Sequence, residues 1–379
     1  MTLAFVTTYG EANRTGWSGI GHYMARALER QGLLLEHIGP LQEKSPALAT
    51  AKQWAYSAVC KRYWRDRDPR ILRDFARQVA ARLSSLQADV VFSPGTIPIA
   101  YVDCDAPIVV WTDATFAGMI GFYPEYSTLS AETLRGGNQA ERSALERCRL
   151  AIYTSDWAAA GAVRHYGVDP GKVRVVPLGA NVAREPTPDE VARAIRGRNR
   201  RPWRLLFLGR DWQRKGGEVA VEVTVALNEG GFPTRLTVVG CEPRLGDRAR
   251  PHVEAVGRLE TDRSSEHEWL LALLAQSHFM ILPTLADCTP VAISEANAFG
   301  VPCLTTSVGG IPTVLRDGVN GKLFPAATAA PEYVAFITEV LTTPERYQAL
   351  AVSSFAEYQA RLNWRVAGEA VQRFLQEVV

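Results

Sequence analysis

The feature that most constrains the fold is a repeated alternation between short apolar segments and helix-like segments. Apolar runs of strand length occur at 3–7, 33–38, 89–92, 107–111, 150–154 and 173–177, and again at 203–208, 235–239, 255–259, 278–282 and 301–306. Strands that alternate with helices form parallel sheets with helices on both faces. Because the pattern occurs twice, we predict an α/β chain with two doubly wound, Rossmann-like domains facing each other across a cleft.

A segment rich in proline, asparagine and charge separates the two series. Residues 181–202 lie between the last strand of the first series and the strand at 203–208. A chain of 379 residues is long enough for two domains. We therefore predict one domain over 1–180, a linker over 181–202 that contains a short helix, and a second domain over 203–362.

The stretch 282–325 contains the most informative pattern of the second series. Thr289 and Pro290 are a good N-cap and first helical residue for a helix over 292–299. Asp287 and Glu295 lie at the two ends of this loop–helix unit. A helix N-terminus attracts anions, and a nearby carboxylate accepts hydrogen bonds from hydroxyl groups. This arrangement suits a ligand with a phosphate and a sugar hydroxyl, although a capped helix with a surface acid is an equal alternative.

Two further loops also leave a strand and enter a helix. Arg210 and Lys215 flank such a loop in the second series, where phosphates bind. In the first series, the loop at 16–21 has the spacing G-x-x-G-x-G and includes Gly19 and Gly21. This is not the dinucleotide fingerprint, but the glycines allow close approach of a ligand. Asp113 follows a strand end, where it either binds a ligand or caps a helix.

Composition excludes several classes of protein. The net charge of +2 gives no global argument for nucleic-acid binding, and six scattered cysteines without a C-x-x-C pair indicate reduced thiols. We see neither a leader sequence nor a membrane span, so we expect a cytoplasmic protein. The basic and aromatic segment 52–82 indicates a solvated helical face or, alternatively, a peripheral contact with a membrane or an anionic acceptor. The two D-x-D patterns, at 66–68 and 103–105, are weak indications of a metal.

Several motifs in order make the chain similar to the family-four retaining glycosyltransferases of the GT-B fold. The similarity is strongest over 203–325. The motifs are the G-R…K-G pattern at 209–216, an E-x7-E-like pattern at 287–295, the turns at 308–312 and 317–321, and the segments at 155–157, 166–168 and 175–179. Each motif is weak alone, and their shared order carries the resemblance.

The resemblance implies specific roles for these residues. In such enzymes the N-terminal domain binds the acceptor and the C-terminal domain binds a nucleotide sugar, and we expect a final helix over about 363–379 to pack back on the first domain. Arg210 and Lys215 would neutralise the donor diphosphate, Asp287 would hold the transferred sugar, and Glu295 would accept the ribose hydroxyls. The remaining expected donor contacts are Gly19, Gly21, Arg258, Leu259, Thr289, Val291 and Ala292.

The resemblance also implies the reaction. We expect transfer of a hexose from a nucleoside-diphosphate sugar, with UDP favoured and GDP next, to a hydroxyl of a sugar, lipid or small-molecule acceptor in carbohydrate biosynthesis. Front-face attack would retain the anomeric configuration, without a metal or other cofactor. The usual histidine at the end of the fourth strand is Thr112 here, and we expect Asp113 to take part of its role. A non-catalytic nucleotide-sugar-binding protein and a sugar-nucleotide epimerase are the alternatives. An NAD-dependent dehydrogenase is a third alternative, but this chain lacks the dinucleotide-binding pattern G-x-G-x-x-G that such enzymes carry.

Overall fold

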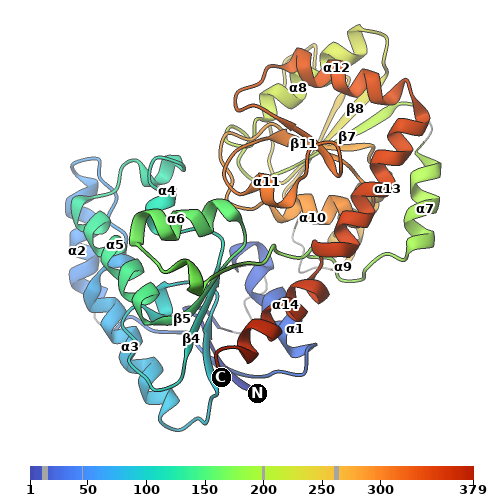
Figure 1. Cartoon of the computed structure of the whole chain (residues 1–379). Helices are drawn as coiled ribbons and strands as arrows, with labels where there is room; N and C mark the ends of the chain where they lie inside the picture. The colour runs from blue at the N-terminus through green and yellow to red at the C-terminus, as the bar shows by residue number, and fades with distance from the viewer. Residues whose placement is uncertain (11–15, 45, 199–200, 260–263) are drawn as a thin grey trace. The chain divides into compact units, whose positions relative to one another are not determined.

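A computed structural model describes residues 1–10, 16–44, 46–198, 201–259 and 264–379. It divides into two compact units (Figure 1), which are described separately: unit 1 comprises Met1–Val176 and Ala367–Val379, and unit 2 comprises Pro177–Val366. Each unit contains a six-stranded sheet in which all pairs of neighbouring strands are parallel. The predicted fold class, two doubly wound parallel-sheet domains, is confirmed.

The sheet of unit 1 has the strand order β2-β1-β3-β4-β5-β6. Its strands are β1 (Thr2–Val6), β2 (Leu34–Ile38), β3 (Val90–Ser93), β4 (Ile108–Thr112), β5 (Cys148–Tyr153) and β6 (Val173–Val175). Its helices are α1 (Ile20–Glu29), α2 (Pro46–Ser57), α3 (Pro69–Leu83), α4 (Phe116–Met119), α5 (Ala131–Arg147) and α6 (Asp156–Tyr166). β3 and β4 are buried along their whole length, as expected of central parallel strands.

The sheet of unit 2 has the order β12-β11-β10-β7-β8-β9. Its strands are β7 (Trp203–Leu208), β8 (Thr234–Val239), β9 (Val253–Gly257), β10 (Phe279–Leu282), β11 (Cys303–Thr306) and β12 (Gly321–Phe324). Its helices are α7 (Pro188–Gly197), α8 (Gly217–Glu229), α9 (Ser264–Gln276), α10 (Val291–Ala298), α11 (Ile311–Val314), α12 (Ala330–Leu341) and α13 (Pro344–Arg361). α8 packs against α12, and α10 packs against α13 (Figure 1).

The last helix, α14 (Trp364–Gln376), crosses the boundary between the units. In unit 1, the Gln372 side chain donates a hydrogen bond to the carbonyl of Gln31 at 2.8 Å. Gly368 lies against the carbonyl of Ala27, where a Cβ would come within 2.8 Å of the oxygen. The final residues of the chain are therefore part of the same unit as β1.

The linker region belongs to unit 2. It contains α7, which begins with a complete capping box between Thr187 and Glu190. Before α7, the segment from Pro177 runs beside the end of α13, where the amide of Ala180 donates to the carbonyl of Leu362 at 3.1 Å. The indole of Trp364 donates to Asn181 Oδ1 at 3.0 Å. The two connections between the units therefore lie side by side within unit 2.

Candidate functional site

The strand order of unit 2 fixes the place of its candidate site. From β7 the chain proceeds outward to β8 and β9, whereas from β10 it proceeds in the other direction to β11 and β12. β7 and β10 are neighbours, so the loops that follow them diverge at the carboxyl edge of the sheet. Open parallel sheets bind ligands at this topological switch point.

The two diverging loops are joined by a buried ion pair. Lys215, from the loop after β7, forms an ion pair with Asp287, from the loop after β10. Their side chains are 12% and 9% exposed, so the pair is largely shielded from water. The structure therefore brings together two of the predicted site residues that are 72 positions apart.

Arg214 holds the same two loops in place. Its guanidinium donates to the carbonyl of Ala286 at 2.6 Å and lies 3.7 Å from the carboxylate of Asp287. Its own carbonyl accepts a hydrogen bond from the amide of Leu285 at 2.7 Å. Arg214 was not predicted from the sequence, because its side chain acts through backbone groups of a distant loop.

Gly216 permits the close approach of these loops. Its φ of +74° lies in the left-handed region, and a Cβ here would come within 2.0 Å of the carbonyl oxygen of Pro283. Gly216 is also the N-cap of α8. The glycine of the K-G pattern is therefore required by the contact with the loop after β10.

Helix α10 spans Val291–Ala298, close to the predicted range of 292–299, but its N-cap differs from the prediction. Pro290, not Thr289, is the N-cap, and it has an extended conformation with φ −74° and ψ 109°. The Thr289 hydroxyl is buried and donates to the carbonyl of Cys288 at 2.7 Å. The prediction of Thr289 as the capping residue was wrong, because the proline adopts the extended cap conformation itself. Val291 and Ala292 are the first residues of the helix, and their amides have no acceptor within it.

Glu295 lies one turn further along α10 and is partly buried. Its carboxylate accepts a hydrogen bond from the backbone amide of Asn181. Burial raises its pKa to about 7, and that hydrogen bond lowers it in part. The neighbouring Ser294 donates to the carbonyl of Leu178 at 3.2 Å. Asn181 was not identified from the sequence, because it acts through its backbone.

The other predicted donor residues of unit 2 lie at neighbouring strand ends. Arg210 follows β7, is exposed, and makes no hydrogen bond or ion pair with any residue that the structure describes. Arg258 is exposed directly after β9, and Leu259 packs against the core. β7, β8 and β9 are neighbours in the sheet, so Arg210 and the 258–259 segment lie at its same edge. Their roles in binding stay predictions.

In unit 1, the glycine-rich loop and Asp113 lie at the same edge of the sheet. The indole of Trp17 donates to Asp113 Oδ2 at 3.3 Å, which joins the loop after β1 to the end of β4. Gly19 is the N-cap of α1 with φ +79°. Gly21 faces the hydroxyl of Tyr9, and a Cβ here would come within 2.0 Å of it. A side chain at this position would therefore displace the Tyr9 hydroxyl.

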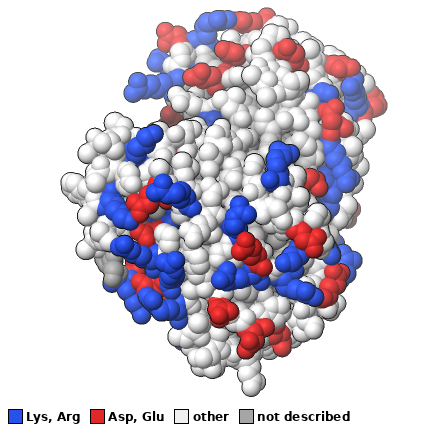
Figure 2. All heavy atoms as spheres, turned by 60° about the vertical axis from the view of Figure 1, so that its left-hand side comes forward, with Lys and Arg blue, Asp and Glu red and all other residues white. Residues whose placement is uncertain are grey.

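The basic segment 52–82 forms α2 and α3, on the side of the molecule that Figure 2 brings forward. Many of its cations are paired: Lys52 with Asp68 and Glu132, Arg65 with Glu43, Arg67 with Asp66, and Arg77 with Asp74. Figure 2 accordingly shows basic and acidic side chains interspersed. Three apolar side chains are exposed along or just after α2: Leu48 (49%), Trp54 (77%) and Val59 (64%).

Asp68 of the first D-x-D pattern has a structural role. It caps α3 by accepting from the amide of Arg70 at 2.8 Å, and it also accepts from the hydroxyl of Tyr63. Within the described ranges, we find no cluster of three or more His, Cys, Asp or Glu side chains suited to hold a metal ion. Nor does that part of the chain contain a helix with the length and apolar character needed to span a bilayer.

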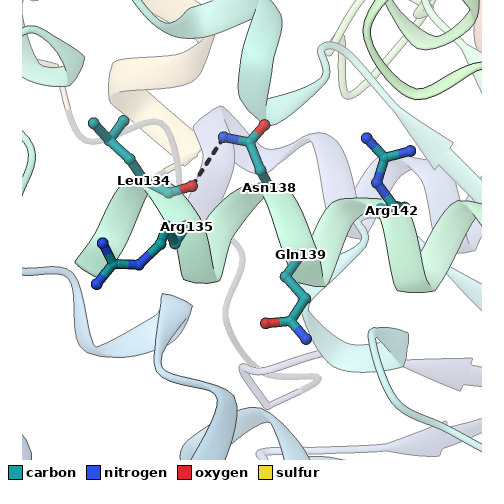
Figure 3. Close-up of a pocket in the computed structure, with 5 residues that line it drawn as sticks. All are labelled: Leu134, Arg135, Asn138, Gln139 and Arg142. Atoms are coloured by element: carbon teal, nitrogen blue, oxygen red, sulfur yellow. Dashed lines mark hydrogen bonds between the residues drawn. The ribbon is translucent and has the colours of Figure 1, made fainter. Parts of the chain in front are cut away.

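A hollow of about 430 Å³ lies along α5 in unit 1 (Figure 3). It is lined by Leu134, Arg135, Asn138, Gln139 and Arg142. The Asn138 amide nitrogen donates to the carbonyl of Leu134 at 2.8 Å, and its oxygen accepts from the hydroxyl of Tyr166 at 2.8 Å. Asn138 is therefore part of the internal scaffold that supports α4 and α6.

Comparison with known proteins agrees with this architecture. The family described as "Glycosyltransferase Family 4" matches residues 21–184, and the family described as "Glycosyl transferases group 1" matches residues 202–343. Sucrose-phosphate synthase from Thermosynechococcus elongatus has a similar structure, with a TM-score of 0.72, 18% identity, and coverage of 100% of this chain and 98% of that one. HepE from Anabaena in complex with UDP gives a TM-score of 0.65 at 14% identity, with both chains fully covered.

Curated relatives include D-inositol 3-phosphate glycosyltransferases. The protein from Rhodococcus opacus is 26% identical over 203 residues, which cover 51% of this chain and 45% of the relative. The protein from Geodermatophilus obscurus is 30% identical over 232 residues, which cover 55% of this chain and 49% of the relative. The alignments thus span about half the length of these relatives.

Together, the two parallel sheets, the joined loops at the switch point and the two family matches define a GT-B protein. The chain belongs to the family-four glycosyltransferases, as the motifs of its second half indicated.

Proposed function

We propose that this protein transfers a hexose from a nucleoside-diphosphate sugar to an acceptor hydroxyl. The observation that carries the proposal is the ion pair between Lys215 and Asp287 at the switch point of unit 2, beside the start of α10. A cation, helix amides and an exposed arginine at one sheet edge suit a diphosphate. The structural relative HepE has been solved with UDP and with UDP-glucose, which favours a UDP-linked donor, with GDP next.

In the proposed reaction, the bond between the anomeric carbon and the diphosphate oxygen breaks, and the acceptor oxygen bonds to that carbon on the same face. The acceptor proton passes to an oxygen of the leaving phosphate. Lys215 and Arg210 stabilise the charge that develops on the diphosphate. Glu295 accepts the ribose hydroxyls, and Asp287 holds the hydroxyls of the transferred sugar. In this scheme the two cations supply the charge that a metal would otherwise supply.

On the acceptor side, we propose that Asp113 contacts the incoming hydroxyl or the transferred sugar. The hydrogen bond from Trp17 supports this role, because it orients the carboxylate at the carboxyl edge of the first sheet. We also propose a peripheral membrane contact through α2, supported by the exposed Trp54 and Val59 beside exposed Lys61 and Arg62.

The test begins with a thermal-shift panel of UDP- and GDP-linked hexoses, with and without EDTA. The stabilising donor is then incubated with inositol phosphates and sugars, and both nucleoside diphosphate release and product are measured. We expect acceptor-dependent release and NMR signals that show a retained anomeric configuration. Binding without release indicates a non-catalytic protein, an altered donor sugar without release indicates an epimerase, and an inverted product excludes front-face attack.

A further inference from the structure

A series of aromatic side chains in unit 1 has no role in the function proposed above. Five rings follow one another across three segments, in the order Trp64 after α2, Tyr126, Tyr123 and Phe122 between α4 and α5, and Trp157 in α6. The centres of successive rings lie 4.6, 6.4, 5.3 and 4.8 Å apart. All five side chains are half-buried, so each of them keeps part of its surface in solvent. We call this set the aromatic row.

One end of the aromatic row lies at the same edge of the sheet as Asp113. Asp113 follows β4, and Trp157 follows β5, which pairs with β4. The helices α4 and α6 are in contact (Figure 1), and a Cβ at Gly118 of α4 would lie 3.6 Å from the Trp157 ring. A ligand whose hydroxyl reaches Asp113 therefore has the aromatic row next to its remaining atoms.

Hydrogen bonds fix the backbone that carries the aromatic row. The amides of Phe122 and Tyr123 both donate to the carbonyl of Met119 at 3.1 Å. At the other end of the row, the amide of Trp64 donates to the hydroxyl of Thr133 at 3.0 Å. The rings are therefore positioned before a ligand arrives, which reduces the entropy cost of binding.

The charges around the aromatic row favour a ligand without a negative charge. The region between β4 and α5 contains Asp113 and Glu125 but no lysine, arginine or histidine. Asp156 adds a third carboxylate at the start of α6. Arg67 lies beside the row, and it is already paired with Asp66 at 3.2 Å. A phosphate bound over the row would therefore be repelled by the carboxylates.

The rings themselves favour a sugar over an acyl chain. Four of the five carry an N–H or O–H group, and Phe122 is the exception. Successive rings are also turned against each other, by 81° between Trp64 and Tyr126 and by 82° between Phe122 and Tyr123. A pyranose ring offers an apolar C–H face, which aromatic faces attract, and hydroxyl groups at its edge. An acyl chain would instead cover the polar groups of the row without pairing them.

We propose that the acceptor is a neutral oligosaccharide whose reacting hydroxyl lies at Asp113 and whose further sugar rings bind the aromatic row. The row selects this acceptor by the shape of its rings and by its lack of charge. The role in transfer rests on the proposed function, whereas binding of the oligosaccharide to the row does not.

Isothermal titration calorimetry with the full chain tests binding without a donor sugar. The probes are maltotriose, cellotriose and mannotriose, each with and without UDP. We expect at least one of them to bind, and Phe122→Ala to weaken that binding about tenfold, since part of an aromatic contact is lost. Trp269→Ala removes a 45% exposed ring in unit 2 and is the matched control, for which we expect wild-type affinity. The proposal is overturned if no trisaccharide binds, or if Phe122→Ala binds it as the wild type does.

Two comparisons test the chemical class of the ligand. The trisaccharide that binds should do so about fivefold more tightly than its sulfated form, and Glu125→Lys should reduce this difference, because Glu125 is exposed. Tighter binding of the sulfated form to the wild type would contradict the neutral acceptor. Binding of decyl glucoside without binding of any trisaccharide would assign the row to an acyl chain and overturn the proposal.

Transfer assays separate this inference from the proposed function. We expect Phe122→Ala to raise the acceptor KM about tenfold and to leave the donor KM unchanged. If trisaccharides bind the row but no donor supports transfer, the proposed function fails and the sugar-binding role of the row stands. If transfer occurs with equal acceptor KM in variant and wild type, the proposed function stands and this inference fails.

Phe122→Leu serves if Phe122→Ala does not fold. Leucine keeps most of the apolar volume that the neighbouring rings pack against, but it removes the aromatic face. We expect the same loss of trisaccharide affinity at a melting temperature close to that of the wild type. Unchanged affinity in Phe122→Leu overturns the proposal.

Discussion

Replacing Lys215 by methionine separates the two contributions of the ion pair at the switch point. The methionine keeps most of the apolar stem and removes the ammonium group. Asp287, with a side chain only 9% exposed, then loses its main partner. Arg214 stays 3.7 Å from the carboxylate and compensates in part. The variant therefore affects stability through Asp287 and turnover through the donor diphosphate.

The expected magnitudes differ for the two effects. Stranding one member of a buried pair costs 3–5 kcal/mol, and the residual contact with Arg214 places Lys215→Met at the lower end, about 3 kcal/mol. For a unit of this size, that loss lowers the melting temperature by roughly 6–12 °C. Removing a group that stabilises developing charge lowers kcat by roughly 10²–10³.

The double variant Lys215→Met/Asp287→Asn distinguishes these effects. Neutralising Asp287 removes the unpaired charge, so we expect at least half of the lost stability to return while turnover stays low. Calorimetry and initial rates of nucleoside diphosphate release measure the two quantities. A wild-type melting temperature in Lys215→Met would refute the buried pair, and near wild-type turnover in the double variant would refute the catalytic role.

Three further predictions concern other described residues. Because burial raises the pKa of Glu295 from 4.5 to about 7, its contribution to stability is largest below pH 4.5 and is lost as the pH rises through 7. Glu295→Gln should remove this loss, about 3.4 kcal/mol at pH 8, and flatten the dependence of melting temperature on pH, while raising donor KM. A parallel pH dependence in variant and wild type would contradict this. Gly216→Ala should reduce donor binding at least tenfold and destabilise unit 2 by about 2 kcal/mol, because its Cβ meets the Pro283 carbonyl. Gly246→Ala, where nothing lies within 4 Å, is the control in differential scanning fluorimetry and donor titration. Trp54→Ala should lower binding to anionic vesicles severalfold in flotation assays with an unchanged melting temperature, because this side chain is 77% exposed. Equal flotation of both proteins would remove α2 from the contact.

Strands and helix ends could be predicted well where neighbouring residues in the sequence determine them. The strand 203–208 was predicted with the bounds that β7 has, since its apolar run is closed by glycine. Ser155 is a further local signal, since serine is a good N-cap and its side chain accepts from the amide of Ala158 at the start of α6 at 3.2 Å. Contacts between residues far apart in the sequence cannot be predicted from such local patterns. Helix α5 begins at Ala131 and includes Gly136 and Gly137, because tertiary packing outweighs the low helix propensity of these glycines.

The candidate site shows the same division. Lys215, Asp287 and Glu295 were predicted as site residues from the spacing of the motifs, but the motifs do not show that the first two form an ion pair. Asn181 binds Glu295 through its backbone, so its side-chain type gives no indication of that contact. Arg210 and Arg214 are both basic residues of the loop after β7, so residue type alone does not show which of them contacts Asp287. The motif pointed to Arg210, and Arg214 was therefore not predicted.

The division of the chain into units has a consequence for synthesis. Unit 1 consists of two segments of the sequence, one before and one after unit 2. The second segment contains Gly368 and Gln372 of α14, which contact α1 and the turn after it. On the ribosome, the first 176 residues emerge without the helix that covers this part of α1. Unit 1 therefore reaches its final packing only after unit 2 has been made. Unit 2 is contiguous in sequence and can fold first, so the order of completion is the reverse of the order of translation.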